Sequence, residues 1–161
     1  MINNIKKSNI SEKGFTLVEM LVVISLIGIL ASLALVSFTN SQKQARDTER
    51  KSDLRQYQTA LENYASKNTG LYPSYTAATD ADGSLCTILA IGTCPSDPKD
   101  TSPYIYRYIS NGSGGGTVNG TTYSFWTGLE SKTTTTYWVV CSSGKIGESA
   151  TQPTAGTICP I

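Results

Sequence analysis

One carboxylate stands near the start of an otherwise apolar segment. Residues 12–38 read EKGFTLVEMLVVISLIGILASLALVSF, and Glu19 is the single acid between Phe15 and Phe38. A charge at the centre of a bilayer costs about 3 kcal/mol on insertion scales. The chemistry open to this carboxylate is pairing with a cation, which neutralises part of its charge.

Four cysteines form the second group with chemical potential: Cys86, Cys94, Cys141 and Cys159. Neither close pair has the C-x-x-C spacing of a zinc ribbon or a thioredoxin-like site. An even number of cysteines beyond the apolar segment fits two disulfides formed outside the cytoplasm. Three pairings are possible. We expect the local one, Cys86 with Cys94 and Cys141 with Cys159; four reduced, buried thiols are the alternative.

The remaining residues do not form a recognisable catalytic site. The chain has no histidine, the commonest general base and metal ligand. Acids occur at Asp80, Asp82, Asp97 and Asp100, but no glutamate stands twelve positions into a loop that begins at Asp80, as an EF-hand requires. We therefore expect no enzymatic activity, no cofactor and no metal site.

The apolar segment is long enough to cross a membrane. From Met20 to Val36 there is no formal charge, and with its flanks the helix could span about 30 Å of hydrocarbon. The polar residues before it lack the apolar core of an ordinary secretory signal. Basic residues lie on both sides and leave the orientation ambiguous, but the cysteines favour a head outside the cytoplasm.

The stretch KGFTLVEMLVVISLIGILASLALVSF resembles the N-terminal signature of type IV pilins and of type II secretion pseudopilins. The resemblance implies that a prepilin peptidase cuts between Gly14 and Phe15 and that Phe15 is then N-methylated. Glu19 becomes the fifth residue of the mature chain, on the same helix face as the new amine. Many pilins carry a proline at the position of Val36, so local unwinding of the helix there is not implied.

The same resemblance implies a role in assembly. Glu19 would pair with the amine of a neighbouring subunit, and the partners would be copies of the chain and related pilins in a helical filament. Prepilin peptidase, the inner-membrane assembly machinery and membrane lipid would be partners before assembly. We expect a type IV pilus subunit, first in the cytoplasmic membrane and then in a cell-surface pilus or periplasmic filament. The alternatives are a type II secretion pseudopilin and a minor tip pilin that binds DNA or a surface ligand.

Four segments follow from these features: a leader (1–14), a transmembrane and filament-core helix (15–38), the amphipathic second half of that helix (39–70) and a globular head (71–161). In the second half, Leu54, Tyr57, Leu61 and Tyr64 repeat at helical spacing and predict a core-facing stripe. We expect Asp47 to pair with lysines at 43 and 51 on a solvated face. The helix should end at residues 68–70, where glycine suits a C-cap.

Three strand-like runs, 104–110, 121–129 and 134–142, predict an antiparallel three-stranded sheet packed on the helix. The fold class is therefore α+β and pilin-like. We expect the sheet to contribute Trp126, Tyr137, Trp138 and Val140 to this core. From residue 71 onward the head has four basic and six acidic residues. This balance disfavours nucleic-acid binding, which needs clustered Lys and Arg.

Overall fold

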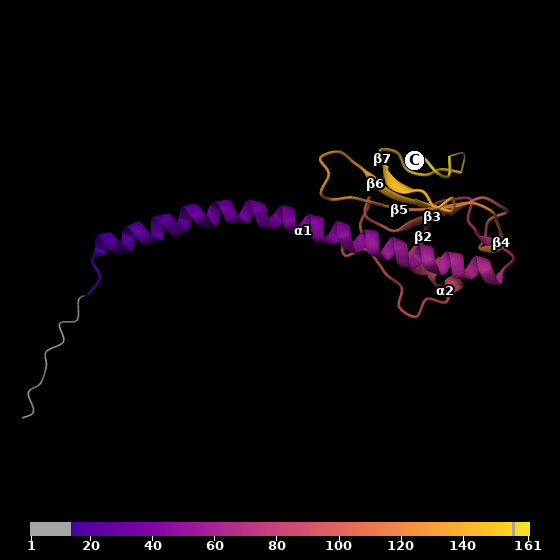
Figure 1. Ribbon diagram of the computed structural model, residues 1–161, viewed down its shortest axis with the longest axis horizontal. Helices are drawn as coiled ribbons and strands as arrows, with labels where there is room; N and C mark the ends of the chain where they lie inside the picture. The colour runs from indigo at the N-terminus through magenta and orange to yellow at the C-terminus, as the bar shows by residue number, and fades with distance from the viewer. Residues whose placement is uncertain (1–13, 156) are drawn as a thin grey trace, which may run out of the picture. The chain divides into compact units, whose positions relative to one another are not determined.

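The protein is described by a computed structural model that covers residues 14–155 and 157–161. All of the predicted leader except Gly14 lies outside the described residues. The chain divides into two compact units, residues 1–39 and 40–161, which we describe separately. Figure 1 shows the elements along the chain, which are α1 (Leu17–Lys67), β1 (Tyr72–Ser74), β2 (Thr79–Asp80), a π-helical turn (Ala81–Leu85), α2 (Cys86–Leu89), β3 (Arg107–Ser110), β4 (Thr117–Gly120), β5 (Tyr123–Gly128), β6 (Tyr137–Cys141) and β7 (Ile146–Ser149).

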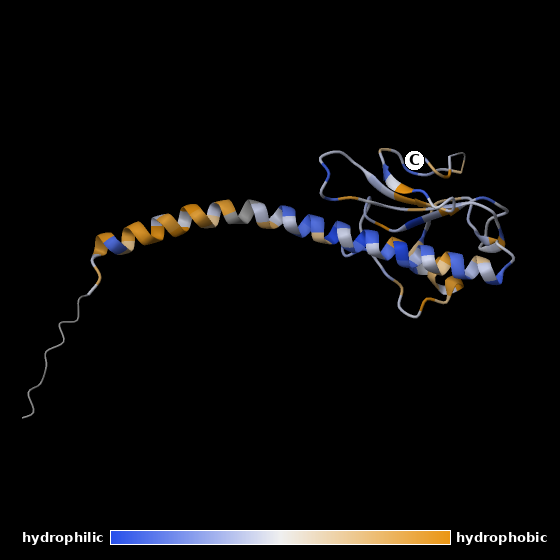
Figure 2. Cartoon of the chain, viewed as in Figure 1, coloured by the Kyte–Doolittle hydropathy of each residue, from blue (hydrophilic) through white to orange (hydrophobic). Residues whose placement is uncertain are grey.

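Helix α1 runs for 51 residues and confirms the long N-terminal helix. Its N-terminal part is apolar, and the rest is mostly hydrophilic with apolar positions among the polar ones (Figure 2). The helix ends in a left-handed turn, in which Thr69 has a φ of 55° and Gly70 a φ of 83°. The amide of Gly70 donates to the carbonyl of Ala65 at 2.8 Å, the long bond of a Schellman ending. The predicted stop is therefore correct, although a threonine takes the first left-handed position.

The head contains two antiparallel sheets, so the prediction of one three-stranded sheet is wrong. One sheet has the order β2-β3-β5-β6-β7, and the other pairs β1 with β4. The three predicted strands form the centre of the larger sheet as β3, β5 and β6. Strands β2, β4 and β7 have only two to four residues each. They are edge strands held by backbone hydrogen bonds, so they lack the apolar pattern that marks a central strand.

The main core lies between the second half of α1 and one face of the larger sheet. The predicted stripe is confirmed at Leu54, Tyr57 and Leu61, which are fully buried. The ring of Tyr57 stacks on that of Phe125, with centroids 4.8 Å apart. Aromatic pairs of this kind add about 1 kcal/mol to the burial of their area. The core residues from the strands and the segment before β3 are Tyr72, Tyr106, Tyr108, Tyr123, Phe125 and Val140.

A second, smaller core lies on the opposite face of the same sheet. Trp126 and Tyr137 pack there with Val139 and Cys141, so the prediction that both aromatics face the helix is wrong. Successive residues of a strand point to opposite faces. Phe125 faces the helix, and its neighbour Trp126 therefore cannot do so.

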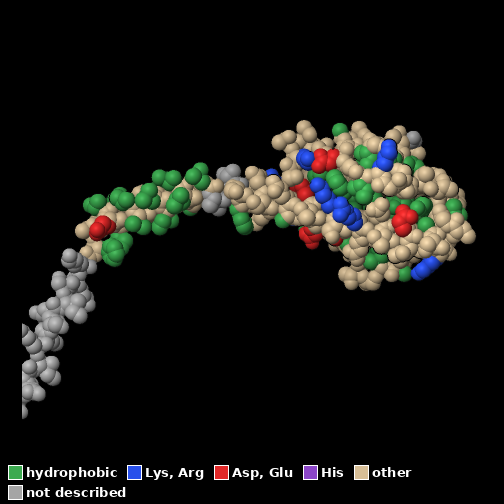
Figure 3. Space-filling view, in the orientation of Figure 1, with side chains coloured by type: hydrophobic (Ala, Val, Ile, Leu, Met, Phe, Trp, Pro, Cys, Tyr) green, Lys and Arg blue, Asp and Glu red, His purple; other side chains and the backbone are tan. Residues whose placement is uncertain are grey.

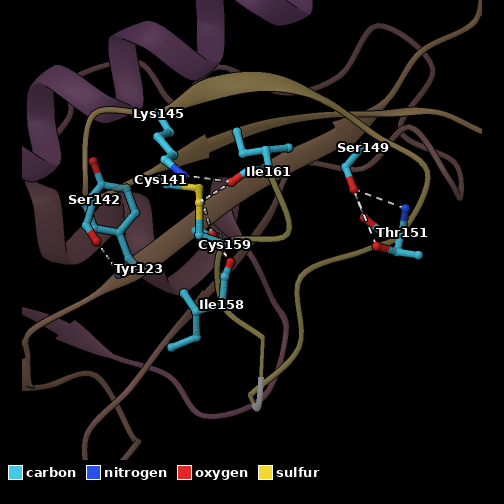
Figure 4. Close-up of a disulfide and its surroundings, with 10 residues drawn as sticks. Tyr123, Cys141, Ser142, Lys145, Ser149, Thr151, Ile158, Cys159 and Ile161 are labelled. Carbon is cyan, nitrogen blue, oxygen red and sulfur yellow. Dashed lines mark hydrogen bonds between the residues drawn. A yellow bond between two sulfur atoms is a disulfide. The ribbon is translucent and has the colours of Figure 1, made fainter.

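Disulfides join the cysteines that are close in sequence. Cys86 pairs with Cys94 and Cys141 with Cys159, with Cα–Cα distances of 5.9 and 5.8 Å. The second bond holds the C-terminal tail over the smaller core, where Lys145 Nζ donates to the carbonyl of Ile161 at 3.3 Å (Figure 4). The tail, which has no sequence periodicity, is thus fixed by a covalent bond and polar contacts.

Candidate functional site

The predicted processing site lies in an exposed segment just before α1. Gly14, Phe15 and Thr16 precede the first helical residue and are all exposed, Phe15 to 79%. The Gly14–Phe15 peptide bond is therefore outside regular secondary structure, where a protease can bind an extended backbone.

A capping box closes the N-terminus of α1 and contains the predicted assembly residue. The hydroxyl of Thr16 accepts a hydrogen bond from the backbone amide of Glu19 at 3.2 Å. The Glu19 carboxylate accepts in return from the backbone amide of Thr16 at 2.8 Å and from its hydroxyl at 2.7 Å. This is the reciprocal arrangement in which a helix satisfies two of its free N–H groups. Glu19 is thus partnered within its own helix.

Thr16 is a partner of Glu19 that the sequence reasoning missed. The predicted partner of Glu19 was the Phe15 amine of a neighbouring subunit, which would exist only after cleavage; in the intact chain the Phe15 nitrogen is an amide. The missed signal was the T-x-x-E spacing immediately before an apolar run. The carboxylate also lies at the helix N-terminus, where the backbone dipoles favour negative charge.

The first half of α1 presents apolar side chains all round. In Figure 3 hydrophobic side chains cover this part of the helix. Within the described residues, α1 is the one helix long and apolar enough, by length and composition, to cross a membrane. The exposed large side chains have accessible fractions between 48% and 81%; they are Leu17, Val18, Met20, Leu21, Val22, Val23, Ile24, Leu26, Ile27, Ile29, Leu30 and Leu33.

The two hydroxyls of this apolar part are satisfied internally. Ser25 donates to the carbonyl of Val22, and Ser32 donates to that of Ile29, each at 2.7 Å. Such back-bonding removes the need for an outside partner when the helix enters an apolar environment. With Gly28 between them, the serines leave small side chains that permit close approach of another helix.

A second constellation, a buried ion cluster, lies in the head unit. Arg50 is fully buried and donates to three carboxylates. Its Nε and Nη2 donate to the two carboxylate oxygens of Asp97, at 2.5 and 3.0 Å. Nη2 also donates to Glu130 at 2.6 Å, and Nη1 donates to Asp47 at 2.8 Å. Glu130 also accepts a two-bond fork from Arg46, at 2.9 and 2.7 Å. The cluster joins α1 to the segments around residues 97 and 130.

This cluster overturns the prediction that Asp47 forms pairs on a solvated face. Asp47 is 4% exposed, and its carboxylate accepts from the backbone amides of Glu130 and Ser131, both at 2.9 Å, as well as from Arg50. The i,i+4 spacing to the lysines was present in sequence, but Asp47 binds Arg50, three positions away, and two backbone amides that lie 83 and 84 positions away. Sequence spacing alone does not report such contacts.

The cluster lowers the pKa of Glu130 and that of Asp47, which keeps both carboxylates charged. Hydrogen bonds from Arg46 hold the pKa of Glu130 well below its usual range. Burial acts to raise the pKa of Asp47, but the hydrogen bonds from Ser131, Glu130 and Arg50 outweigh it, and that pKa is lowered. Three cations, with Lys99 as the third, balance three carboxylates. The arrangement is a structural tie rather than a reactive site, because each charged group is neutralised.

Metal binding has no support in the described part of the chain, where no group of three His, Cys, Asp or Glu side chains could hold an ion. The acids at positions 80, 82, 97 and 100 do not form such a group. Asp80 instead pairs with Arg107 at 2.7 Å.

Comparison with known proteins finds a family match in the N-terminal region and two similar proteins. Residues 10–35 match the family described as the prokaryotic N-terminal methylation motif. The chain is 33% identical over 63 residues to the type IV major pilin protein PilA of Myxococcus xanthus. These matched residues make up 39% of this chain and 29% of that protein. It is 35% identical over 72 residues to the type II secretion system core protein G of Pectobacterium carotovorum, and this match makes up 45% of this chain and 46% of that protein. The matches thus span less than half of either relative, and no solved structure matches significantly.

The exposed apolar helix begins with the Thr16–Glu19 capping box and carries the N-terminal methylation motif. The resemblance to type IV pilins and type II secretion pseudopilins is confirmed. The proteins that this chain resembles are pilins and pseudopilins, which are structural proteins and not enzymes.

Proposed function

We propose that the protein is a structural subunit of a type IV pilus or related filament. It is cut by prepilin peptidase between Gly14 and Phe15, methylated at Phe15, and assembled through the helix of residues 15–38 with copies of itself and related pilins. The observation that carries this proposal is the exposed apolar helix whose first turn holds Glu19 in a capping box. An aqueous subunit would not leave so much apolar surface uncovered.

The capping box supports a two-stage role for Glu19. In the free subunit Thr16 satisfies the carboxylate, which lowers the cost of holding it at the membrane surface. Cleavage creates a cationic amine at Phe15. In the filament the carboxylate lies among apolar helices, where an unpaired charge costs several kcal/mol, so the amine of a neighbouring subunit becomes its partner. The pairing selects the register in which each subunit is added.

Location follows from the same elements. Before assembly the apolar helix anchors the chain once in the cytoplasmic membrane with the head outside, in contact with lipid and the inner-membrane assembly machinery. The two disulfides of the head suit an oxidising compartment. After assembly the subunit resides in a cell-surface pilus or a periplasmic filament.

The proposal is tested by intact-mass spectrometry of filaments sheared from cells. A chain that begins at methylated Phe15 supports a processed, surface-displayed subunit, and a chain that retains Gly14 in all fractions contradicts it. Glu19→Ala should leave insertion and processing intact but abolish efficient incorporation. Glu49→Ala, which removes an exposed acid from the same helix, is the matched control and should assemble normally.

A pseudopilin of type II secretion is the second candidate, favoured by the similarity to core protein G. A pseudopilin would be processed in the same way but recovered from the membrane fraction rather than from sheared pili. Deleting the gene would then stop export of secreted enzymes and leave surface pili unchanged.

A further inference from the structure

A small hollow lies on the face of the larger sheet that is opposite the second half of α1. Arg107 of β3 and Trp126 of β5 line it from the sheet, where they stand directly opposite each other in the strand register. The other lining residues come from the segments before β2 and β3 and from the C-terminal tail; they are Ala78, Ser102, Pro103, Ile105 and Gln152. The hollow has a volume of about 140 Å³. A cavity of about 150 Å³ holds a benzene ring, so this one has room for about six non-hydrogen atoms.

The indole N–H of Trp126 is an unused hydrogen-bond donor at this hollow. Trp126 is 2% exposed, and its Nε1 makes no hydrogen bond with another described residue. A buried indole N–H usually has an acceptor. Trp138 also lacks an acceptor among the described residues, but its Nε1 is sealed from solvent, whereas that of Trp126 is not. Because Trp126 lines the hollow and is otherwise buried, its N–H reaches solvent there.

Arg107 adds a cation with further unused donors. Its Nη1 pairs with Asp80 at 2.7 Å, in an ion pair at the surface. Its Nε and Nη2 have no acceptor within the part of the chain that the structure describes, and neither has the hydroxyl of Ser102. The edge of a guanidinium binds both oxygens of one carboxylate. The described residues that line the hollow include no Asp or Glu that could occupy this edge.

Hydrogen bonds to the sheet hold the walls of the hollow in place. On one side, Thr127 Oγ1 donates to the carbonyl of Tyr104 at 2.8 Å, and the amide of Gly128 donates to that of Pro103 at 3.0 Å. On the other side, Gln152 Nε2 donates to the hydroxyl of Tyr137 at 2.8 Å. A ligand that enters a site already held in this way orders few additional groups, so less affinity is lost on binding.

We infer that this hollow binds a small organic carboxylate. The guanidinium of Arg107, the indole N–H of Trp126 and the hydroxyl of Ser102 donate to its oxygens, while Pro103 and Ile105 contact its carbon atoms. A carboxylate is the ligand because the unused polar groups are mostly donors and one of them is cationic. The inference does not depend on the proposed filament function, since one unassembled chain supplies every group named.

The carboxylate can come from a free acid or from the end of a longer molecule. Ala78, Ser102 and Gln152 are exposed, so the hollow opens at the surface and the remainder of a longer ligand could extend into solvent. The chemistry recognised inside the hollow is the same in both cases, and probes of different length distinguish them.

Indole N–H resonances of the full chain, labelled with ¹⁵N in mild detergent, test the inference. Sodium propionate should move the Trp126 resonance until it saturates, with a Kd on the order of millimolar for a ligand of about five non-hydrogen atoms. The Trp138 resonance is the internal control and should stay in place, because that N–H is sealed from solvent and Trp138 packs on the helix side of the sheet. Trp138→Phe assigns the two resonances.

Variants identify the groups that bind the probe. Arg107→Gln should weaken propionate binding at least about tenfold, the lower range for a hydrogen bond to a charged group, and Ser102→Ala about threefold. Lys132→Gln is the matched control, because it makes the same charge change and breaks another surface ion pair, with Glu148. It should bind propionate like the wild type. An unchanged Trp138 resonance verifies that each variant is folded.

The neutral isostere propionamide, and sodium chloride at equal ionic strength, should leave the Trp126 resonance in place. An equal shift with either one overturns the carboxylate assignment. A Trp126 resonance that does not respond at about a hundred times the expected Kd overturns the site itself, as does full affinity in both Arg107→Gln and Ser102→Ala. Binding of N-acetylglycine as well as propionate would show that the hollow accepts the carboxylate end of a peptide, and its exclusion would restrict the ligand to a free small acid.

Discussion

Replacing Arg50 should cost the head a large part of its stability. Its side chain is fully buried and holds three carboxylates at 2.5 to 3.0 Å. In Arg50→Met, Glu130 keeps Arg46 and Asp47 keeps two backbone amides, but Asp97 keeps only the backbone amides after it. Leaving one buried charge without its partner costs about 3 to 5 kcal/mol. A typical domain has about 5 to 15 kcal/mol in total.

Urea unfolding of the full chain in mild detergent, followed by tryptophan fluorescence, measures this loss. Both tryptophans lie in the larger sheet, so the signal reports the head. With a slope of about 2 kcal/mol per molar, the midpoint should fall by about 2 M. Arg50→Met with Asp97→Asn should recover about 1 to 3 kcal/mol, because the orphaned charge is gone. Arg55→Met, exposed on the same helix, should change stability by less than about 0.5 kcal/mol.

Two outcomes would refute this reasoning. A loss below about 1 kcal/mol for Arg50→Met would mean that the carboxylates find water or other donors once the guanidinium is removed. A double variant less stable than the single one would mean that Asp97 acts through contacts other than its pair with Arg50.

Three further predictions concern the head. Hydrogen bonds from Arg46 depress the pKa of Glu130, so the stability that this group contributes is present above the unfolded pKa of about 4.3 and is lost as pH falls below it. In Glu130→Gln the free energy of unfolding, measured in urea, should therefore fall less between about pH 5 and 2 than in the wild type. Gly128→Ala should destabilise by about 1 to 3 kcal/mol in the same assay, since its Cβ would lie 2.8 Å from the carbonyl oxygen of Pro103; unchanged stability would show that this loop yields. Serine replacement of both cysteines of the tail disulfide, 18 residues apart, should lower the free energy of unfolding by about 3 kcal/mol. A variant that lacks the disulfide on a non-reducing gel but unfolds at the same urea concentration as the wild type would contradict this value.

The sequence predicted those parts of the fold that local patterns encode. The stripe at Leu54, Tyr57 and Leu61 has the helical periodicity that burial imposes, the apolar run is continuous, and the three central strands are rich in β-branched and aromatic residues. The short edge strands lack it, because their pairing depends on backbone groups that every residue has. The prediction for Trp126 was wrong for a different reason: Trp126 follows Phe125 in β5, and successive residues of a strand point to opposite faces of the sheet.

The candidate site was predicted unevenly for a similar reason. Glu19 is conspicuous because an acid in an apolar run needs an explanation, whereas Thr16 looked unremarkable although it sits at capping-box spacing. The ion cluster around Arg50 was missed because Asp97 and Glu130 are 47 and 80 residues away in sequence. Only the folded chain shows that a run of charges on α1 is partly buried.

Strand β5 has no face left for solvent. All six of its residues are buried, with Phe125 packed toward the helix and Trp126 toward the disulfide-held tail. A label or epitope placed in this strand would disrupt one core or the other. Residues 133–135 between β5 and β6, by contrast, are exposed and lie beyond the Ser131 amide that binds Asp47. Insertions should be tolerated there, which makes it the natural position for a fluorophore or tag that reports on the protein in living cells.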